Sequence, residues 1–137
     1  MSTHAQTIAR RTSGTSLLRR ALQLDGVASG VMGLGFLAGG AALDSALGLP
    51  STFLWAVGAF LVPYAAALLF IASRPQVNRV AAWVIAVGNV VWSVDSVVLL
   101  ATGWYDVTLL GEVVVLGQAV AVLGFAAAQY LGLRRSA

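Results

Sequence analysis

The sequence predicts an all-α integral membrane protein, a four-helix bundle with four transmembrane spans and both termini in the cytoplasm. Its composition is the first observation, because hydrophobic residues make up 59% and charged residues only 9% of the 137 residues. Soluble domains contain about 25% charged residues. The second observation is that four long segments are almost free of charge. The third is that all eight basic residues are arginines, in three groups between these segments, at residues 10–20, 74–79 and 134–135.

The arginine groups determine the predicted topology. Segments rich in arginine near membrane spans usually stay in the cytoplasm, so an even number of spans must separate successive groups. A helix needs about 20 apolar residues to cross a ~30 Å hydrocarbon core. The predicted spans are about 22–43, 52–72, 80–102 and 108–131. The chain then forms a single transmembrane domain, 1–137, in an inner or plasma membrane, and residues 1–20 form a basic cytoplasmic tail.

Glycines dominate the first span. Two GxxxG spacings occur, at Gly26/Gly30 and at Gly35/Gly39, and small residues four apart let another helix backbone approach closely in lipid. Packing against the other spans of the same chain is the favoured interpretation. The alternative is a homo-oligomer that associates through this span.

The second span follows the turn-forming residues 49–51 and contains Pro63 near its centre. Proline removes one backbone hydrogen bond and favours a kink. Kinks often border cavities, so the neighbouring Tyr64 is a candidate binding residue, although a simple packing kink fits equally well.

The third span carries the densest polar sequence, which contains Asn89, Trp92, Asp95 and Ser96. Residues three apart lie about 60° from each other on a helix, so the first three fan across one broad face. A charge at the centre of a membrane helix costs roughly 2.5–3.5 kcal/mol on insertion scales. We therefore expect this face to point inward.

The fourth span contributes Glu112, Gln118 and Gln129. Helical rise places Glu112 near the predicted depth of Asp95, and Gln118 near that of Asn89. The expected interior is an outer acidic layer, Asp95 with Glu112, above an amide layer of Asn89 and Gln118, with Trp92 between them. No arginine lies at that depth, so the two acids should share a proton.

Asp25 is a secondary candidate at the other end of the bundle. It follows Arg20 by five residues, about 7.5 Å of helical rise, and is expected to pair with Arg20 or Arg79 at the cytoplasmic boundary. This role is structural rather than functional.

The composition also excludes several classes of function. The chain has no cysteine, and its only histidine, His4, lies in the polar tail, so we expect no metal and no cofactor. The formal charge of +3 reflects topology and contacts with the lipid bilayer, not nucleic-acid binding. No soluble catalytic domain fits in this length.

The polar face predicts an intramembrane pocket that takes a lipophilic small molecule. The leading hypothesis is an enzyme in which Asp95 and Glu112 divide acid and base roles in an isomerisation, cyclisation or epoxide opening. In this hypothesis the substrate is bound by Asn89, Trp92, Gln118, Tyr64 and Ser96. Alternatives are a proton- or cation-coupled transporter, a binding site for an amine, and an interaction subunit whose polar residues only hold helices together.

Overall fold

The computed structural model describes residues 3–136, and within this range the chain forms four α-helices and no strands. They are α1 (Thr3–Leu47), α2 (Ser51–Ser73), α3 (Arg79–Thr102) and α4 (Leu109–Arg135). Each is long and apolar enough to cross a membrane. The predicted all-α, four-span architecture is therefore confirmed, and the ends of α2, α3 and α4 lie within about four residues of the predicted bounds.

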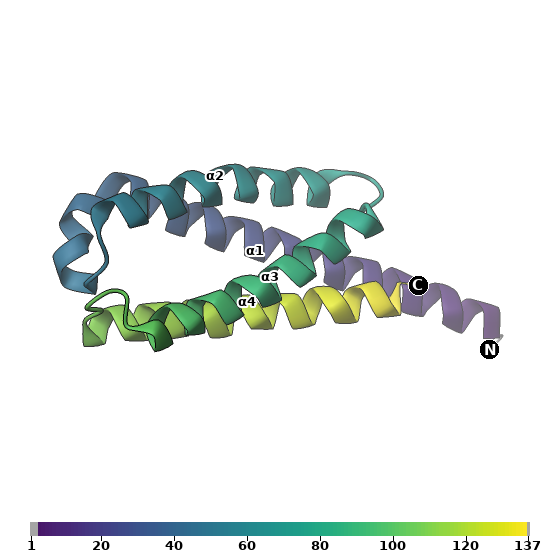
Figure 1. Ribbon diagram of the computed structural model, residues 1–137. Coiled ribbons are helices and arrows are strands. Elements are labelled where there is room, and N and C mark those ends of the chain that lie inside the picture. The colour runs from purple at the N-terminus through teal and green to yellow at the C-terminus, as the bar shows by residue number, and fades with distance from the viewer. Residues whose placement is uncertain (1–2, 137) are drawn as a thin grey trace.

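The first helix is much longer than predicted, because it begins at Thr3 and includes the described part of the basic tail. Its 45 residues correspond to about 68 Å of helical rise, twice the thickness of the hydrocarbon core. Figure 1 shows its N-terminal part extending past the other helices. Residues 3–20 contain no proline, and Gly14 packs against Arg135 at the end of α4, which supports a continuous helix.

The long α1 is the centre of the bundle and packs against both α2 and α4, while α3 packs mainly against α4. Its contact with α2 runs along Gly26, Gly30, Gly33 and Gly40. A Cβ atom at Gly33 would lie 2.9 Å from the Cβ of Leu61, so a larger side chain would separate the helices. Intrachain packing thus accounts for these four glycines.

The other glycines of α1 lie on a different face. A Cβ atom at Gly35 would meet nothing within 4 Å, and one at Gly39 would meet only Leu43 of the same helix. Association of two copies through this face stays a prediction.

Two loops meet at one end of the bundle, which we call the distal end, at residues 48–50 and 103–108. Gly48 ends α1 with a φ of 73°, a conformation that favours glycine. Thr108 caps α4 by accepting a hydrogen bond from the Gly111 N–H over 3.0 Å. Its own hydroxyl donates to the Ala46 carbonyl over 2.6 Å, so the 103–108 loop is tied to the end of α1.

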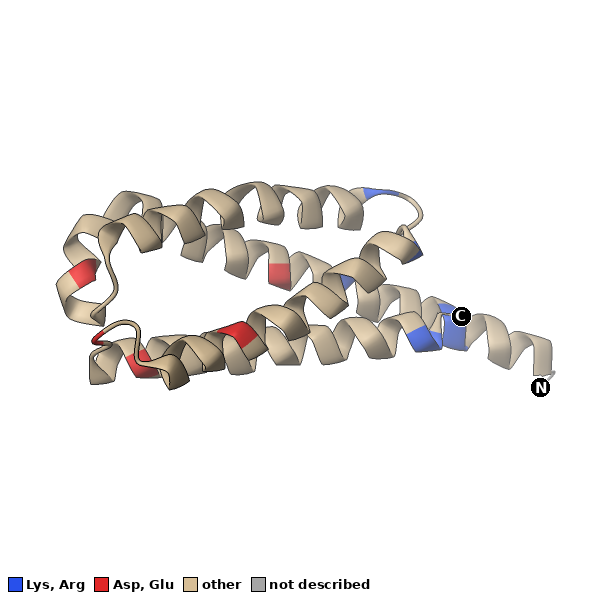
Figure 2. Ribbon diagram, viewed as in Figure 1, with Lys and Arg blue, Asp and Glu red and all other residues tan. Residues whose placement is uncertain are grey.

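The opposite end carries the arginines, and we call it the arginine end (Figure 2). Two of them bind the free carbonyls at helix C-termini. Arg19 donates to the carbonyls of Ala72, in the last turn of α2, and of Arg74 and Pro75 just after it. Arg79 donates to the Leu133 carbonyl over 2.9 Å near the end of α4. Both contacts are favourable because a cation there complements the helix dipole.

Candidate functional site

A largely apolar cavity of about 270 Å³ lies towards the distal end, with α2 on one side and α3 on the other. The two helices are close at their short connection and diverge towards the distal end (Figure 1). The volume of the cavity is near the lower limit for sites that bind small molecules. The lining comes from all four helices and comprises Met32, Phe36, Leu47, Leu49, Phe53, Leu54, Val57, Trp92, Asp95, Ser96, Leu99, Val114, Val115 and Gln118.

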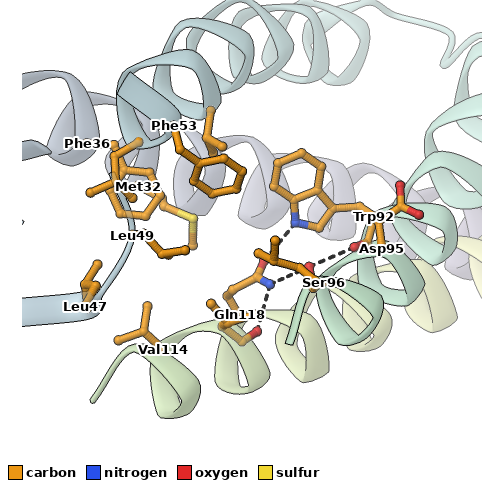
Figure 3. Close-up of a pocket in the computed structure, with 14 residues that line it drawn as sticks. Met32, Phe36, Leu47, Leu49, Phe53, Trp92, Asp95, Ser96, Val114 and Gln118 are labelled. Atoms are coloured by element: carbon orange, nitrogen blue, oxygen red, sulfur yellow. Dashed lines mark hydrogen bonds between the residues drawn. The ribbon is translucent and has the colours of Figure 1, made fainter. Parts of the chain in front are cut away.

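One wall of the cavity is a hydrogen-bonded group of Trp92, Gln118 and Ser96 (Figure 3). The indole N–H of Trp92 donates to Gln118 Oε1 over 2.8 Å. The Gln118 Nε2 donates to Ser96 Oγ over 2.9 Å and to the Val115 carbonyl over 2.8 Å. Because their donors are already used within the wall, these side chains shape the cavity more than they offer hydrogen bonds to a ligand.

Asp95 also lines the cavity but belongs to no such group. Its side chain is exposed, and it forms no hydrogen bond or ion pair with any other residue in the described range 3–136. Figure 3 shows its carboxylate directed away from the hydrogen bonds of Trp92, Ser96 and Gln118. Asp95 is therefore an uncompensated carboxylate at the rim of an apolar cavity.

Glu112 does not join Asp95. It lies in the first turn of α4, is exposed and is not among the residues that line the cavity. The two acids lie at different depths, because Glu112 is about 4.5 Å from the start of α4 at Leu109, while Asp95 is about 10 Å from the end of α3. The expected Asp95–Glu112 layer is not formed, and Glu112 instead stands at a helix N-terminus, where an acid is favoured.

A second polar group lies deeper, where all four helices meet. It comprises Asp25 and Ser29 of α1, Tyr64 of α2, Asn89 of α3 and Gln129 of α4, and we call it the buried cluster. Asn89 Nδ2 donates to Asp25 Oδ2 over 2.7 Å and to Gln129 Oε1 over 3.1 Å. Gln129 Nε2 donates to the same Asp25 oxygen over 2.9 Å, and Ser29 Oγ to Asp25 Oδ1 over 3.2 Å. The Tyr64 hydroxyl donates to Asn89 Oδ1 over 2.8 Å.

The buried cluster corrects two predictions from the sequence. Asn89 pairs with Gln129 and not with Gln118. The two glutamines are eleven residues apart, about three helical turns, so they share one stripe of α4, and the depth estimated from helical rise pointed to the wrong one.

Asp25 is bound by amides and a hydroxyl instead of an arginine, and no ion pair is found among residues 3–136. The expected partner Arg79 uses its guanidinium on Leu133 and Ser136. Asp25 is 1% exposed, so it is part of the interior and not of the membrane boundary.

Aromatic rings connect the cavity with the buried cluster. Phe60 of α2 stacks on Trp92 of the cavity wall at 5.9 Å between ring centroids, and on Tyr64 of the buried cluster at 5.6 Å. Phe60 was not a candidate from the sequence, because an apolar residue in an apolar span gives no signal.

An apolar plug closes the buried cluster on the side of the arginine end. It consists of Leu18, Leu22, Leu68, Ala72, Ala82, Ile85 and Leu133. On each of the four helices these residues lie between the buried cluster and the arginine end. The plug interrupts any polar path through the bundle.

Residues 3–136 contain no group of three or more His, Cys, Asp or Glu side chains that could hold a metal ion. Comparison of the chain with protein-family models, with curated proteins and with solved structures gave no match.

Proposed function

We propose that the protein binds a small lipophilic molecule with a basic amine in the distal cavity, and that Asp95 is the counter-ion of that amine. The observation that carries this proposal is the Asp95 carboxylate, which has no partner among residues 3–136 and lies on a largely apolar lining whose other polar side chains bond to each other. Charged groups inside membrane spans are costly and commonly mark a ligand or ion site.

The aromatic lining supports a cationic ligand in particular. Phe36, Phe53 and Trp92 line the cavity, and the face of an aromatic ring attracts an ammonium group with about 0.5–2 kcal/mol. The Trp92 indole N–H is occupied by Gln118, which holds the ring in place. A ligand would thus gain one ionic contact and several apolar ones.

This proposal replaces the two-carboxylate enzyme suggested by the sequence. Acid/base catalysis by a pair needs both groups within reach of one substrate, and Glu112 does not line the cavity. A channel has less support as well, because the apolar plug interrupts the polar path. The position of the arginines continues to support cytoplasmic termini in an inner or plasma membrane.

A matched pair of probes tests the proposal. N,N-dimethylbenzylamine is cationic at neutral pH, and isobutylbenzene has the same shape without the charge. We expect saturable quenching of Trp92 fluorescence by the amine in nanodiscs, using protein whose other three tryptophans are replaced by Phe. The Asp95→Asn variant should bind the amine about tenfold more weakly, a loss of ~1.4 kcal/mol.

Glu112→Gln is the matched control, because it removes a carboxylate outside the cavity, and it should bind the amine like the parent protein. Isobutylbenzene should give the same signal in every variant. Equal amine affinity in Asp95→Asn and the parent protein would refute the proposal.

A further inference from the structure

Asp25 is an acidic residue that the proposed amine site does not use. It is 1% exposed and lies in the centre of a bundle of membrane-spanning helices. A charge without an ionic partner in such a place is costly and rare, and intramembrane acids of this kind often take part in proton transfer. A group that binds and releases a proton needs surroundings that accept both forms of the carboxyl group.

The ionised form is accommodated by hydrogen bonds from three helices. Asp25 Oδ2 accepts from Asn89 and Gln129, and Oδ1 accepts from Ser29. Every buried side-chain nitrogen or oxygen in the described range has a hydrogen-bond partner. Three donors can replace much of the lost hydration of a carboxylate.

The protonated form fits the same site with a single rearrangement. A proton on Oδ1 would point at Ser29 Oγ, 3.2 Å away, and a hydroxyl oxygen accepts as readily as it donates. The Ser29 hydroxyl hydrogen would then turn to the backbone carbonyl four residues earlier, a common bond of helical serines. Asn89 and Gln129 would keep their hydrogen bonds to Oδ2.

Among the residues that the structure describes, no neighbouring charge holds Asp25 in one form. The only titratable side chain hydrogen-bonded within the buried cluster is Tyr64 of α2, which donates to Asn89. From α3 and α4 the cluster receives only the amides Asn89 and Gln129. The arginines Arg19 and Arg79 are bound to carbonyls at helix ends.

The structure also indicates the side from which a proton can arrive. The apolar plug separates Asp25 from the arginine end. On the other side Ser29 is only half-buried, and Met32, about one helical turn further along α1, lines the distal cavity. Ser29, which donates to Oδ1, thus lies on the cavity side of Asp25.

We propose that Asp25 is a proton-binding site of the bundle, where the carboxylate takes one proton from water on Oδ1 by way of the distal cavity and Ser29. The step forms one O–H bond on Oδ1 and removes the negative charge. It exchanges the hydrogen bond from Ser29 to Oδ1 for one from Oδ1 to Ser29 and needs no other reactant. Asp25 itself takes no part in the amine site at Asp95, and its protonation does not require an amine.

Infrared spectroscopy of isotope-labelled protein tests the proposal directly. A variant with Asp44, Asp95 and Asp106 replaced by Asn has Asp25 as its sole aspartate. These three replaced residues lie outside the buried cluster, and none is fully buried. We would incorporate aspartate labelled with ¹³C at the carboxyl group and record spectra in nanodiscs while the pH is lowered.

We expect the labelled carboxylate bands to fall and one labelled C=O band of a protonated carboxyl group to rise, with a small downshift in D₂O. Labelled wild-type protein should show the same pH-dependent C=O band together with signals from its other aspartates. This band should be absent from labelled Asp25→Asn protein. A labelled carboxyl group that stays entirely ionised or entirely protonated while circular dichroism shows a folded protein would overturn the proposal. If the Asp25→Asn variant does not fold, the titration of the sole-aspartate protein alone still decides the test.

Discussion

The Asn89 amide donates to Asp25 over 2.7 Å and joins α3 to α1, two helices that otherwise share little contact. Asn89 is 4% and Asp25 1% exposed. Since α1 also packs on α2 and α4, this bond links the central helix to α3 as well. The position of α3 thus depends on polar contacts as well as on its packing against α4.

Replacing Asp25 should reveal this dependence. Asp25→Leu removes the acceptor of three hydrogen bonds and leaves buried amide N–H groups unsatisfied, at about 1–3 kcal/mol each. We expect it to lower the free energy of unfolding by ~2–4 kcal/mol, and Asp25→Asn by clearly less. Reversible unfolding in mixed micelles measures both. Asp106→Leu at an exposed loop residue is the control, and a loss as large as that of Asp25→Leu would contradict the assignment.

Substitutions at Gly33 and Gly35 distinguish helix packing within one chain from association of two copies. Gly33→Leu should lower the melting temperature strongly, because its Cβ alone would lie 2.9 Å from Leu61. Gly35→Leu should leave it unchanged, since that position is open. Thermal melting in detergent gives the comparison. A change in the sedimentation of Gly35→Leu alone would instead reveal an oligomer contact at this face.

The proposed topology predicts the reactivity of introduced cysteines. The chain has no native cysteine, so only the introduced one can react. A cysteine at Asp106 should react with an impermeant thiol reagent in intact cells. One at Ser136 should react only after the membrane is permeabilised. Labelling of Ser136→Cys in intact cells would place the arginine end outside.

Asp95 and Glu112 should act independently in amine binding. No hydrogen bond joins them within residues 3–136, only Asp95 lines the cavity, and substitutions at separate sites usually add. The double variant Asp95→Asn with Glu112→Gln should therefore bind N,N-dimethylbenzylamine as weakly as Asp95→Asn alone. A further loss in the double variant, measured by the same quenching titration, would show that Glu112 reaches the ligand after all.

Filling the distal cavity should slow proton exchange at Asp25. Val57 lines the cavity, so Val57→Trp narrows the route that passes Ser29. We expect the deuterium shift of the labelled Asp25 band to develop several-fold more slowly after transfer to D₂O. Val84→Trp on the exposed face of α3 is the control. Equal rates in both variants would place the route elsewhere.

The sequence by itself determined the architecture. Four long apolar segments between three arginine groups suffice to predict four spans, because hydrophobic length and charge act locally and do not depend on how the helices pack. Its polar face also anticipated that Trp92, Asp95, Ser96 and Gln118 would gather at one cavity. The glycines of the first span were expected to pack within the chain, as Gly26, Gly30, Gly33 and Gly40 do.

Only the tertiary structure decided which polar residues meet. Helical rise alone placed Asn89 level with Gln118, but the vertical offset of α3 against α4 brings it to Gln129, eleven residues further along the same stripe of α4. Asp25 looked like a boundary residue because Arg20 is close in sequence, but the rotation of the long α1 turns it inward. Offset and rotation are set by close contacts such as Gly132 against the backbone of Leu18, and such contacts follow from the packing of all four helices together.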